Sequence, residues 1–314
     1  DAALTNADCG IHLSNATNCT MGEFGAGNVI SGNACIGIFI EESSNNIDIH
    51  SNYIGTDILG SGEVSNLQEG IYTKNSSNIS IGSEVTGTGN LISANGSYGV
   101  RIDEASEDVS IEGNTIGLNA TDFDDIGNSS NGIYVYNAIN TIIGGTNENS
   151  RNIISGNDEN GIYLWGELTD NTLIQHNYIG LNNAGTDFGN ANDGIVVSDN
   201  VTNTIIKENV ISGNDATGIW VNNFADNTTI IGNKIGTNIA GTSAIGNTFS
   251  GSALQWNSSN TTIGGSEEAD RNIISGNGHN GIWMGDEVSQ TSIDNNFIGT
   301  DITGNTAIPN TQSG

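Results

Sequence analysis

The sequence predicts an all-β fold: a single-stranded, right-handed parallel β-helix of about ten coils, each with three short strands. Three features support it. A sequence motif such as "NIISGN" recurs, at 152–157 and 272–277, strand-like runs lie between its occurrences, and equivalent positions of successive repeats carry like residues. Repeats of about 20 to 50 residues are typical of solenoids. The glycine that opens each repeat is Gly10, Gly37, Gly70, Gly99, Gly132, Gly161, Gly194, Gly218, Gly251 and Gly281.

The first strand follows this glycine and alternates apolar with variable residues, which is the period of a half-buried strand. Pairs such as Ile133 and Val135, or Ile219 and Val221, are expected to point inward, and Ser252 breaks this pattern. The second strand adds one more apolar column, because like positions stack about 4.8 Å apart in neighbouring coils. That column is Met21, Ile49, Ile81, Ile111, Ile143, Ile174, Ile206, Ile230, Ile263 and Ile293.

The third strand opens with Asn-x-Ile in every repeat. The isoleucines extend the core, and the asparagines predict an internal ladder in which each side-chain amide bonds its neighbour. Asn also tolerates the left-handed conformation that a tight corner needs. The isoleucines are Ile30, Ile54, Ile92, Ile116, Ile154, Ile179, Ile211, Ile235, Ile274 and Ile298. The ladder asparagines are Asn28, Asn52, Asn90, Asn114, Asn152, Asn177, Asn209, Asn233, Asn272 and Asn296.

Insertions occur at two fixed places, after the second strand (144–151 and 264–271) and after the third (236–245 and 299–308). A solenoid permits this because loops leave only at its corners. The outward positions of the third strand are apolar, so either these loops or a partner should cover them. Residues 1–314 are predicted to form one continuous β-helix domain, either a segment of a longer rod or a unit that stacks end to end.

The whole chain resembles the right-handed parallel β-helix repeat proteins that share the pectate lyase fold. Phrases such as "RNIISGN" and "NYIGTD" are similar to those of large secreted bacterial surface proteins. The resemblance implies the fold. It leaves function open, because the same fold serves lyases, hydrolases, esterases, adhesins and fibres.

The outward position of the first strand is aromatic in six of ten coils, although aromatic residues make up only 6% of the chain. Such a stripe can stack on sugar rings, can pack against another protein, or can simply reflect the preference of aromatics for exposed strands. The candidate glycan or partner contacts are Phe39, Tyr72, Arg101, Tyr134, Tyr136, Tyr163, Trp165, Trp220 and Trp283.

No catalytic residue is assigned. A lyase needs a strong base, and only Lys74 and Arg101 lie near the aromatic face. A glycosidase needs two carboxylates at a defined separation, but pairs such as Asp103 with Glu104 are adjacent in sequence and point in different directions. The sequence therefore favours a non-enzymatic role, with a polysaccharide lyase or hydrolase as the alternative.

No cofactor is expected apart from calcium, which Asp122, Asp124 and Asp125 in "TDFDD" could bind. A turn cap is the competing interpretation for such loop acids, because Asp57 and Asp301 recur where other coils have Asn. Cys9 and Cys35 lie at near-equivalent corners of stacked coils, so they are a candidate disulfide, which leaves Cys19 unpaired.

The net charge of −30 disfavours nucleic acid and anionic membranes as partners. The Asn-, Gly-, Ser- and Thr-rich composition favours an extracellular or cell-surface protein. The two ends are in phase with the repeat, which predicts end-to-end contact between copies or continuation into a longer rod. The leading hypothesis is thus a structural or adhesive surface rod or filament subunit. A glycan-active or glycan-binding protein that uses the aromatic face is the alternative.

Overall fold

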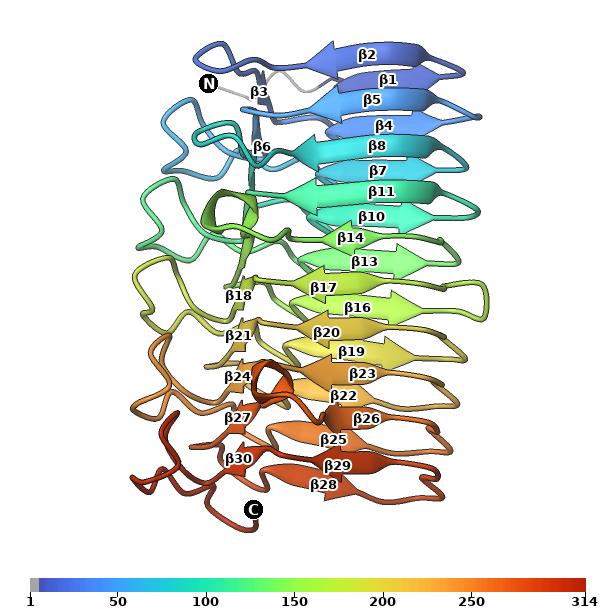
Figure 1. Ribbon diagram of the computed structural model, residues 1–314. Coiled ribbons are helices and arrows are strands. Elements are labelled where there is room, and N and C mark those ends of the chain that lie inside the picture. Colours follow the sequence, from blue (N-terminus) through green and yellow to red (C-terminus); the bar gives the residue numbers. More distant parts are fainter. Residues whose placement is uncertain (1–5) are drawn as a thin grey trace.

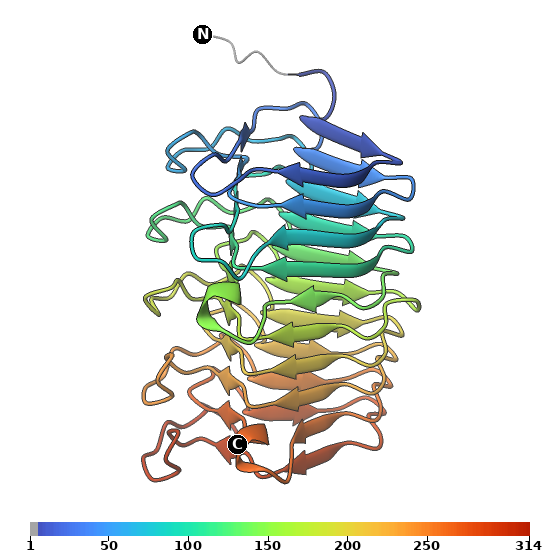
Figure 2. The ribbon, with the colours of Figure 1, turned by 45° about the horizontal axis from the view of Figure 1, so that its top comes forward.

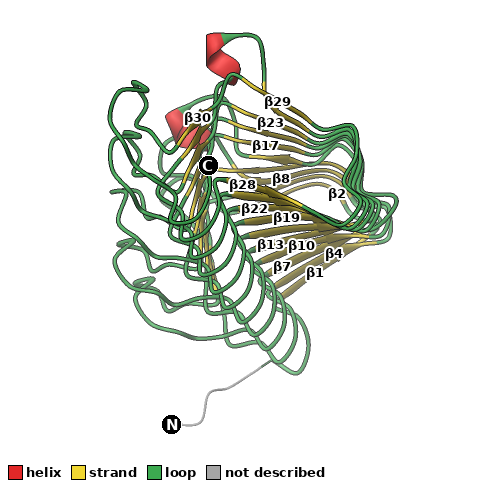
Figure 3. Cartoon of the chain, turned by 90° about the horizontal axis from the view of Figure 1, so that it is seen from below, coloured by secondary structure: helices red, strands yellow, loops and turns green. Residues whose placement is uncertain are grey.

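The computed structural model describes residues 6–314 and confirms the right-handed parallel β-helix (Figure 1). The chain winds through three parallel sheets of ten strands each, and successive coils contribute every third strand to the same sheet. Seen along the axis, the coils superimpose into one cross-section, and long loops project from one side (Figure 3). Among residues 6–314, no helix is long and apolar enough to span a membrane.

Sheet A carries the first strand of every coil. Its strands are β1 (Ile11–Ser14), β4 (Ile38–Glu41), β7 (Ile71–Lys74), β10 (Val100–Asp103), β13 (Ile133–Tyr136), β16 (Ile162–Trp165), β19 (Ile195–Ser198), β22 (Ile219–Val221), β25 (Ser252–Leu254) and β28 (Ile282–Met284).

Sheet B carries the second strand of every coil. Its strands are β2 (Thr17–Met21), β5 (Asn45–Ile49), β8 (Ser77–Gly82), β11 (Glu107–Glu112), β14 (Ile142–Ile143), β17 (Leu173–Gln175), β20 (Ile205–Lys207), β23 (Thr229–Ile231), β26 (Thr262–Gly264) and β29 (Ser292–Asp294).

Sheet C is built from two-residue strands, and two 3₁₀ turns precede it at the insertions after the second strand. Its strands are β3 (Val29–Ile30), β6 (Tyr53–Ile54), β9 (Leu91–Ile92), β12 (Thr115–Ile116), β15 (Ile153–Ile154), β18 (Tyr178–Ile179), β21 (Val210–Ile211), β24 (Lys234–Ile235), β27 (Ile273–Ile274) and β30 (Phe297–Ile298). The turns are η1 (Glu148–Ser150) and η2 (Glu268–Asp270).

The interior is one continuous apolar cluster, and the predicted isoleucine columns lie in it. Ser252 also faces inward and is fully buried. The columns end in partly open positions at the last coil, where Met284 is 46% and Ile293 39% exposed. Burial of apolar surface is the main stabilising contribution here, and only the outermost coils lack a neighbour on one side.

The predicted asparagine ladder is confirmed in all ten coils. Each side-chain amide donates to the Oδ1 atom of the next ladder asparagine at 2.8–3.1 Å, from Asn28 to Asn296. These asparagines do not adopt the left-handed conformation. The residues that do so lie largely at the corner between sheets A and B, such as Asn75, Asn140 and Asn171, so only the hydrogen-bonding part of the prediction was right.

A second asparagine ladder runs at the corner between sheets C and A, and the sequence analysis missed it. Its members also donate from Nδ2 to the next Oδ1, at 2.7–3.0 Å. They are Asn6, Asn33, Asn66, Asn95, Asn128, Asn157, Asn190, Asn214, Asn247, Asn277 and Asn310. Each lies four residues before the glycine position that opens the next repeat, so a fixed offset from that glycine would have revealed them.

The loops between sheets C and A cover the middle of sheet C, as expected. Ile153, Tyr178 and Val210 are buried with Leu118 and Leu181 in a satellite cluster. The cover is incomplete at the N-terminal end, where Val29 on β3 is exposed and lines a hollow of about 510 Å³. The view in Figure 2 shows these loops leaving the same corner coil after coil.

Candidate functional site

The outward residues of sheet A form a single column, as predicted. Cross-strand pairing places each of them beside the equivalent residue of the next coil. The column reads His12, Phe39, Tyr72, Arg101, Tyr134, Tyr163, Val196, Trp220, Ala253 and Trp283. The two halves of this column differ in structure.

In the N-terminal half the rings stack on each other. The ring centroids of His12 and Phe39 are 5.0 Å apart, those of Phe39 and Tyr72 are 5.1 Å apart, and both pairs are close to parallel. The guanidinium of Arg101 then lies 4.6 Å above the Tyr72 ring. Because Phe39 and Tyr72 are covered on both faces, these two rings are not free to stack on a ligand.

Arg101 is the centre of an ionic cluster. Its Nε lies 3.0 Å from Asp103 Oδ2, its NH1 lies 3.2 Å from Glu69 Oε1, and both carboxylates are buried. The Tyr72 hydroxyl also donates to Asp103, at 3.2 Å. Burial alone would lower the pKa of Arg101, but the hydrogen bonds and charges of Asp103 and Glu69 raise it overall.

Neither candidate base has the lowered pKa that proton abstraction needs. Arg101 is kept protonated by two carboxylates. Lys74 lies 3.0 Å from Glu104, and this hydrogen bond raises its pKa. Arg101 therefore acts as the counterion of two buried acids, and Lys74 as that of the exposed Glu104.

In the middle of the face, too, the aromatic rings cover one another. Tyr98 stacks on Tyr134 at 4.7 Å, and Tyr136 stacks on Trp165 at 4.9 Å. Tyr134 is buried beneath these neighbours, and burial raises its pKa. Trp165, 37% exposed, is the most accessible ring of this group.

The C-terminal half is open, because large and small residues alternate. Along the column, Val196 lies between Tyr163 and Trp220, and Ala253 lies between Trp220 and Trp283. Each small residue leaves a hollow, of about 410 Å³ over Val196 and about 500 Å³ over Ala253. Both hollows are lined by Trp220 and Asp193.

Trp220 is fixed in place. Its indole Nε1 donates to Gln255 Oε1 at 2.7 Å, and Trp256 packs against it edge-on with centroids 5.3 Å apart. The ring is therefore pre-oriented, and this reduces the conformational entropy that a ligand would have to remove.

Asp193 is the buried charged group of this region. It is 8% exposed, and its Oδ1 accepts a hydrogen bond from the Thr217 backbone N–H at 2.7 Å. Burial raises the pKa of this carboxyl to about 6. The sequence analysis missed Asp193, Val196 and Ala253. The signal for the last two is their small size in a column of rings, but nothing in the local sequence marks Asp193.

The structure does not gather the predicted calcium ligands. Asp124 accepts from the Asn119 side chain at 2.8 Å, Asp125 accepts from the Gly127 N–H at 3.0 Å, and Asp122 faces Thr115 at 3.5 Å. Among residues 6–314, the only group of three metal-ligating side chains within 4.8 Å of one another is Asp8, Cys9 and Cys35. Calcium binding at the three aspartates stays a prediction.

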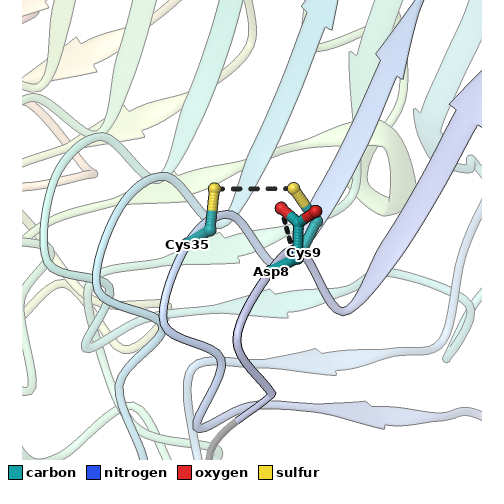
Figure 4. Close-up of side chains that lie close together, drawn as sticks. All are labelled: Asp8, Cys9 and Cys35. Carbon is teal, nitrogen blue, oxygen red and sulfur yellow. Dashed lines mark hydrogen bonds between the residues drawn. The ribbon is translucent and has the colours of Figure 1, made fainter.

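The thiols of Cys9 and Cys35 lie side by side at the start of the first two coils (Figure 4). Their sulfur atoms are 3.5 Å apart, and the structure has all three cysteines as free thiols. Burial and the neighbouring Cys35 raise the pKa of the Cys9 thiol to about 12. The predicted pairing is geometrically near, and the disulfide itself stays a prediction.

Comparison with known proteins supports the fold. No protein-family model and no curated protein matches the sequence. Among solved structures, the periplasmic alginate epimerase AlgG is similar, with a TM-score of 0.56 and 14% identity over 92% of this chain and 61% of that chain. A variant of AlgG gives a TM-score of 0.55 and 15% identity over 81% of this chain and 51% of that one. The chain thus spans half to three fifths of the length of these structures, and at this identity the likeness concerns the fold alone.

Proposed function

We propose that this chain is an extracellular, non-enzymatic β-helix that binds glycans through the outward face of sheet A. The alternation of rings and small residues at β16, β19, β22, β25 and β28 carries this proposal. It leaves two hollows walled by aromatic rings on an otherwise closed face. Aromatic faces with a few polar groups are the usual way in which proteins hold sugar rings.

Two chemical observations support the non-enzymatic part of this proposal. The two cations near this face are paired with carboxylates. The acids that line the hollow over Val196, Asp193 and Asp199, lie before and after β19. The extended strand between them separates their Cα atoms by about 20 Å, which is too far for a catalytic pair. Glycoside cleavage needs two carboxyl groups that flank the scissile bond.

Affinity electrophoresis through gels that contain single polysaccharides tests the proposal. The wild-type protein should be retarded by at least one of them, and Trp220→Ala should migrate as in an empty gel. His12→Ala is the matched control, because it removes a ring from the closed half of the same column. Retardation that survives Trp220→Ala would contradict the assignment of this face.

The same polysaccharides should be assayed for new reducing ends and for unsaturated products. We expect neither to accumulate above the level of a heat-denatured sample. Sustained turnover would make the protein a polysaccharide-active enzyme, which is the alternative function.

A rod-forming role has separate support from the exposed core residues of the last coil, Met284 and Ile293. Strand edges and apolar ends favour the addition of another coil, either from another copy or from a longer chain. This role is compatible with glycan binding, because the hollows lie on the side of the rod.

A further inference from the structure

The two hollows lie in series along the solenoid axis. The small residue of each is flanked on both sides by a ring from the neighbouring coils, and Trp220 is the wall that the hollows share. Ala253 therefore lies between two strands that are about 9.6 Å apart, which is twice the strand spacing. Ala253 itself is only 5% exposed, and the Trp220 indole is hydrogen-bonded to Gln255 of the same coil as Ala253. A sugar ring would therefore lie above Ala253 and contact the rings of Trp220 and Trp283.

We propose that these hollows are successive subsites for a neutral, unbranched oligosaccharide that lies along the axis, with one sugar ring over Val196 and another over Ala253. This inference rests on the proposed function and adds the chemical class of the ligand. It also predicts an order of subsites, in which Trp220 contacts both sugars.

The charges around the two hollows favour a neutral oligosaccharide over an acidic one. None of the six Lys and Arg residues of the chain lines either hollow, whereas Asp193 lines both and Asp199 lines the one over Val196. A uronate would bring a second carboxylate next to a buried one without a cation to pair with it, which is strongly unfavourable. The net charge of −30 adds long-range repulsion.

Sugar hydroxyls match the polar groups that are present. The Asp193 carboxylate accepts the Thr217 N–H at its Oδ1, and the Thr217 hydroxyl lies beside it. Its Oδ2 is the oxygen that a sugar hydroxyl would reach. Gln312, Asn280 and Ser250 add amide and hydroxyl groups around the hollow over Ala253. Hydroxyl groups can satisfy such donors and acceptors, and an apolar ligand would leave them unpaired.

Isothermal titration with defined hexasaccharides tests the inference. The probes are neutral glucan, xylan and mannan fragments, and as acidic counterparts oligogalacturonate and oligomannuronate, each with EDTA and with calcium. At least one neutral fragment should bind, and the acidic fragments should bind at least tenfold more weakly in EDTA. Stronger binding of a uronate in EDTA would overturn the neutral class and leave the proposed function intact.

Filling the hollow locates the site. Ala253→Phe should weaken binding of the neutral fragment at least tenfold, and Ala253→Ser should change it less than twofold. Both variants should fold, because other coils carry Phe39 or Tyr72 at the same position, and circular dichroism checks this. Unchanged binding by a folded Ala253→Phe variant would overturn the subsite over Ala253. Absence of binding to all five fragments and all polysaccharides would overturn the proposed function itself.

Discussion

Each ladder asparagine is used at both ends of its side chain. The Nδ2 of Asn152 donates to Ile111 O at 2.7 Å and to Asn177 Oδ1 at 2.9 Å, and its Oδ1 accepts from the backbone and side-chain N–H groups of Asn114 at 3.0 Å. A buried amide with this full set of partners is favourable. One that loses them leaves its neighbours unpaired.

Asn152→Ala should therefore lower the free energy of unfolding by about 3 kcal/mol, since several buried groups lose their partner together. Urea unfolding followed by circular dichroism measures this. Asn149→Ala, an exposed residue of η1 whose side chain is not hydrogen bonded, is the control and should change little. A loss of less than about 1 kcal/mol for Asn152→Ala would show that water replaces the ladder bonds.

The interior also contains a column of threonines without partners. The hydroxyls of Thr141, Thr172, Thr204, Thr228, Thr261 and Thr291 are buried and make no hydrogen bond. Thr141 precedes Ile142, which pairs with Ser110, so Thr141 stacks on Val109 of the preceding coil. The second, third and fourth coils thus place Ile47, Ile79 and Val109 where the later coils place Thr.

Thr141→Val should raise the stability by about 1 kcal/mol, because it removes an unsatisfied buried hydroxyl while keeping the shape of the side chain. Thermal unfolding measures the change, with Thr186→Val on an exposed loop as the neutral control. A destabilised Thr141→Val would mean that the hydroxyls bond to one another along the column.

Asp193 predicts a pH dependence of stability. Its pKa is raised to about 6 in the folded protein, against about 3.9 for an unperturbed Asp. Between these values the folded state binds more protons than the unfolded state, so this residue should make the protein more stable as the pH falls from 7 towards 4. Asp193→Asn should remove this dependence and should be more stable than wild type at pH 7. The urea midpoints of both proteins are measured at pH 7 and at pH 5. If the midpoints of wild type and Asp193→Asn differ by the same amount at both pH values, the prediction is wrong.

At the scale of the element, the loops between sheets C and A share one turn. The Oδ1 of Asp301 accepts from the N–H groups of Thr303, Asn305 and Thr306, at 3.1–3.2 Å. Asn238 accepts from Thr242 and Ser243 in the same way. This supports the turn-cap interpretation of the Asp and Asn alternation.

Asp301 should stabilise its loop more strongly while it is ionised. Hydrogen bonds, first of all from the Thr303 hydroxyl, lower its pKa to about 2. The part of its contribution that depends on the charge is therefore complete above pH 4 and is lost as the pH falls towards 2. Hydrogen exchange of residues 299–308 should be faster in Asp301→Ala than in wild type and nearly unchanged in Asp301→Asn at neutral pH. Equal protection in all three proteins would contradict the role of the cap.

The elements that could be predicted from the sequence are those in which the same residue recurs at the same position of every coil. Asn-x-Ile stands at the same position in every coil, so both the ladder and the column of isoleucines could be predicted. The open hollows could not, because they depend on which rings cover one another. The outward column alone does not show that Tyr134 is buried by Tyr98 while Trp220 stays partly exposed. Asp193 was missed because its burial arises from neighbouring coils.

At the scale of the whole molecule, the two ends of the stack are unlike the sides. The last coil leaves one edge of β28, β29 and β30 unpaired within residues 6–314. Ile282, Met284 and Ile293 are only partly covered there. Unpaired strand edges beside partly exposed apolar residues are a known cause of edge-to-edge association between chains.

We expect concentration-dependent, end-to-end association in sedimentation velocity experiments. The double variant Met284→Lys and Ile293→Lys should stay monomeric, because it places charge on the contact. Ile205→Lys, on the exposed side of sheet B, is the control and should associate as wild type does. A wild-type protein that sediments as a monomer over a hundredfold range of concentration would contradict this expectation.

The asparagine ladders give the molecule a direction. In both ladders every Nδ2 donor points to the following coil and every Oδ1 acceptor to the preceding one, so the amide dipoles add in series. Within residues 6–314, no ladder donor reaches the Oδ1 atoms of Asn6 and Asn28, and the amides of Asn296 and Asn310 donate to backbone carbonyls instead of a further ladder residue. A coil that continued either ladder would have to donate at the first end and accept at the last. It would therefore add head to tail, and such contacts generate open polar filaments rather than closed dimers.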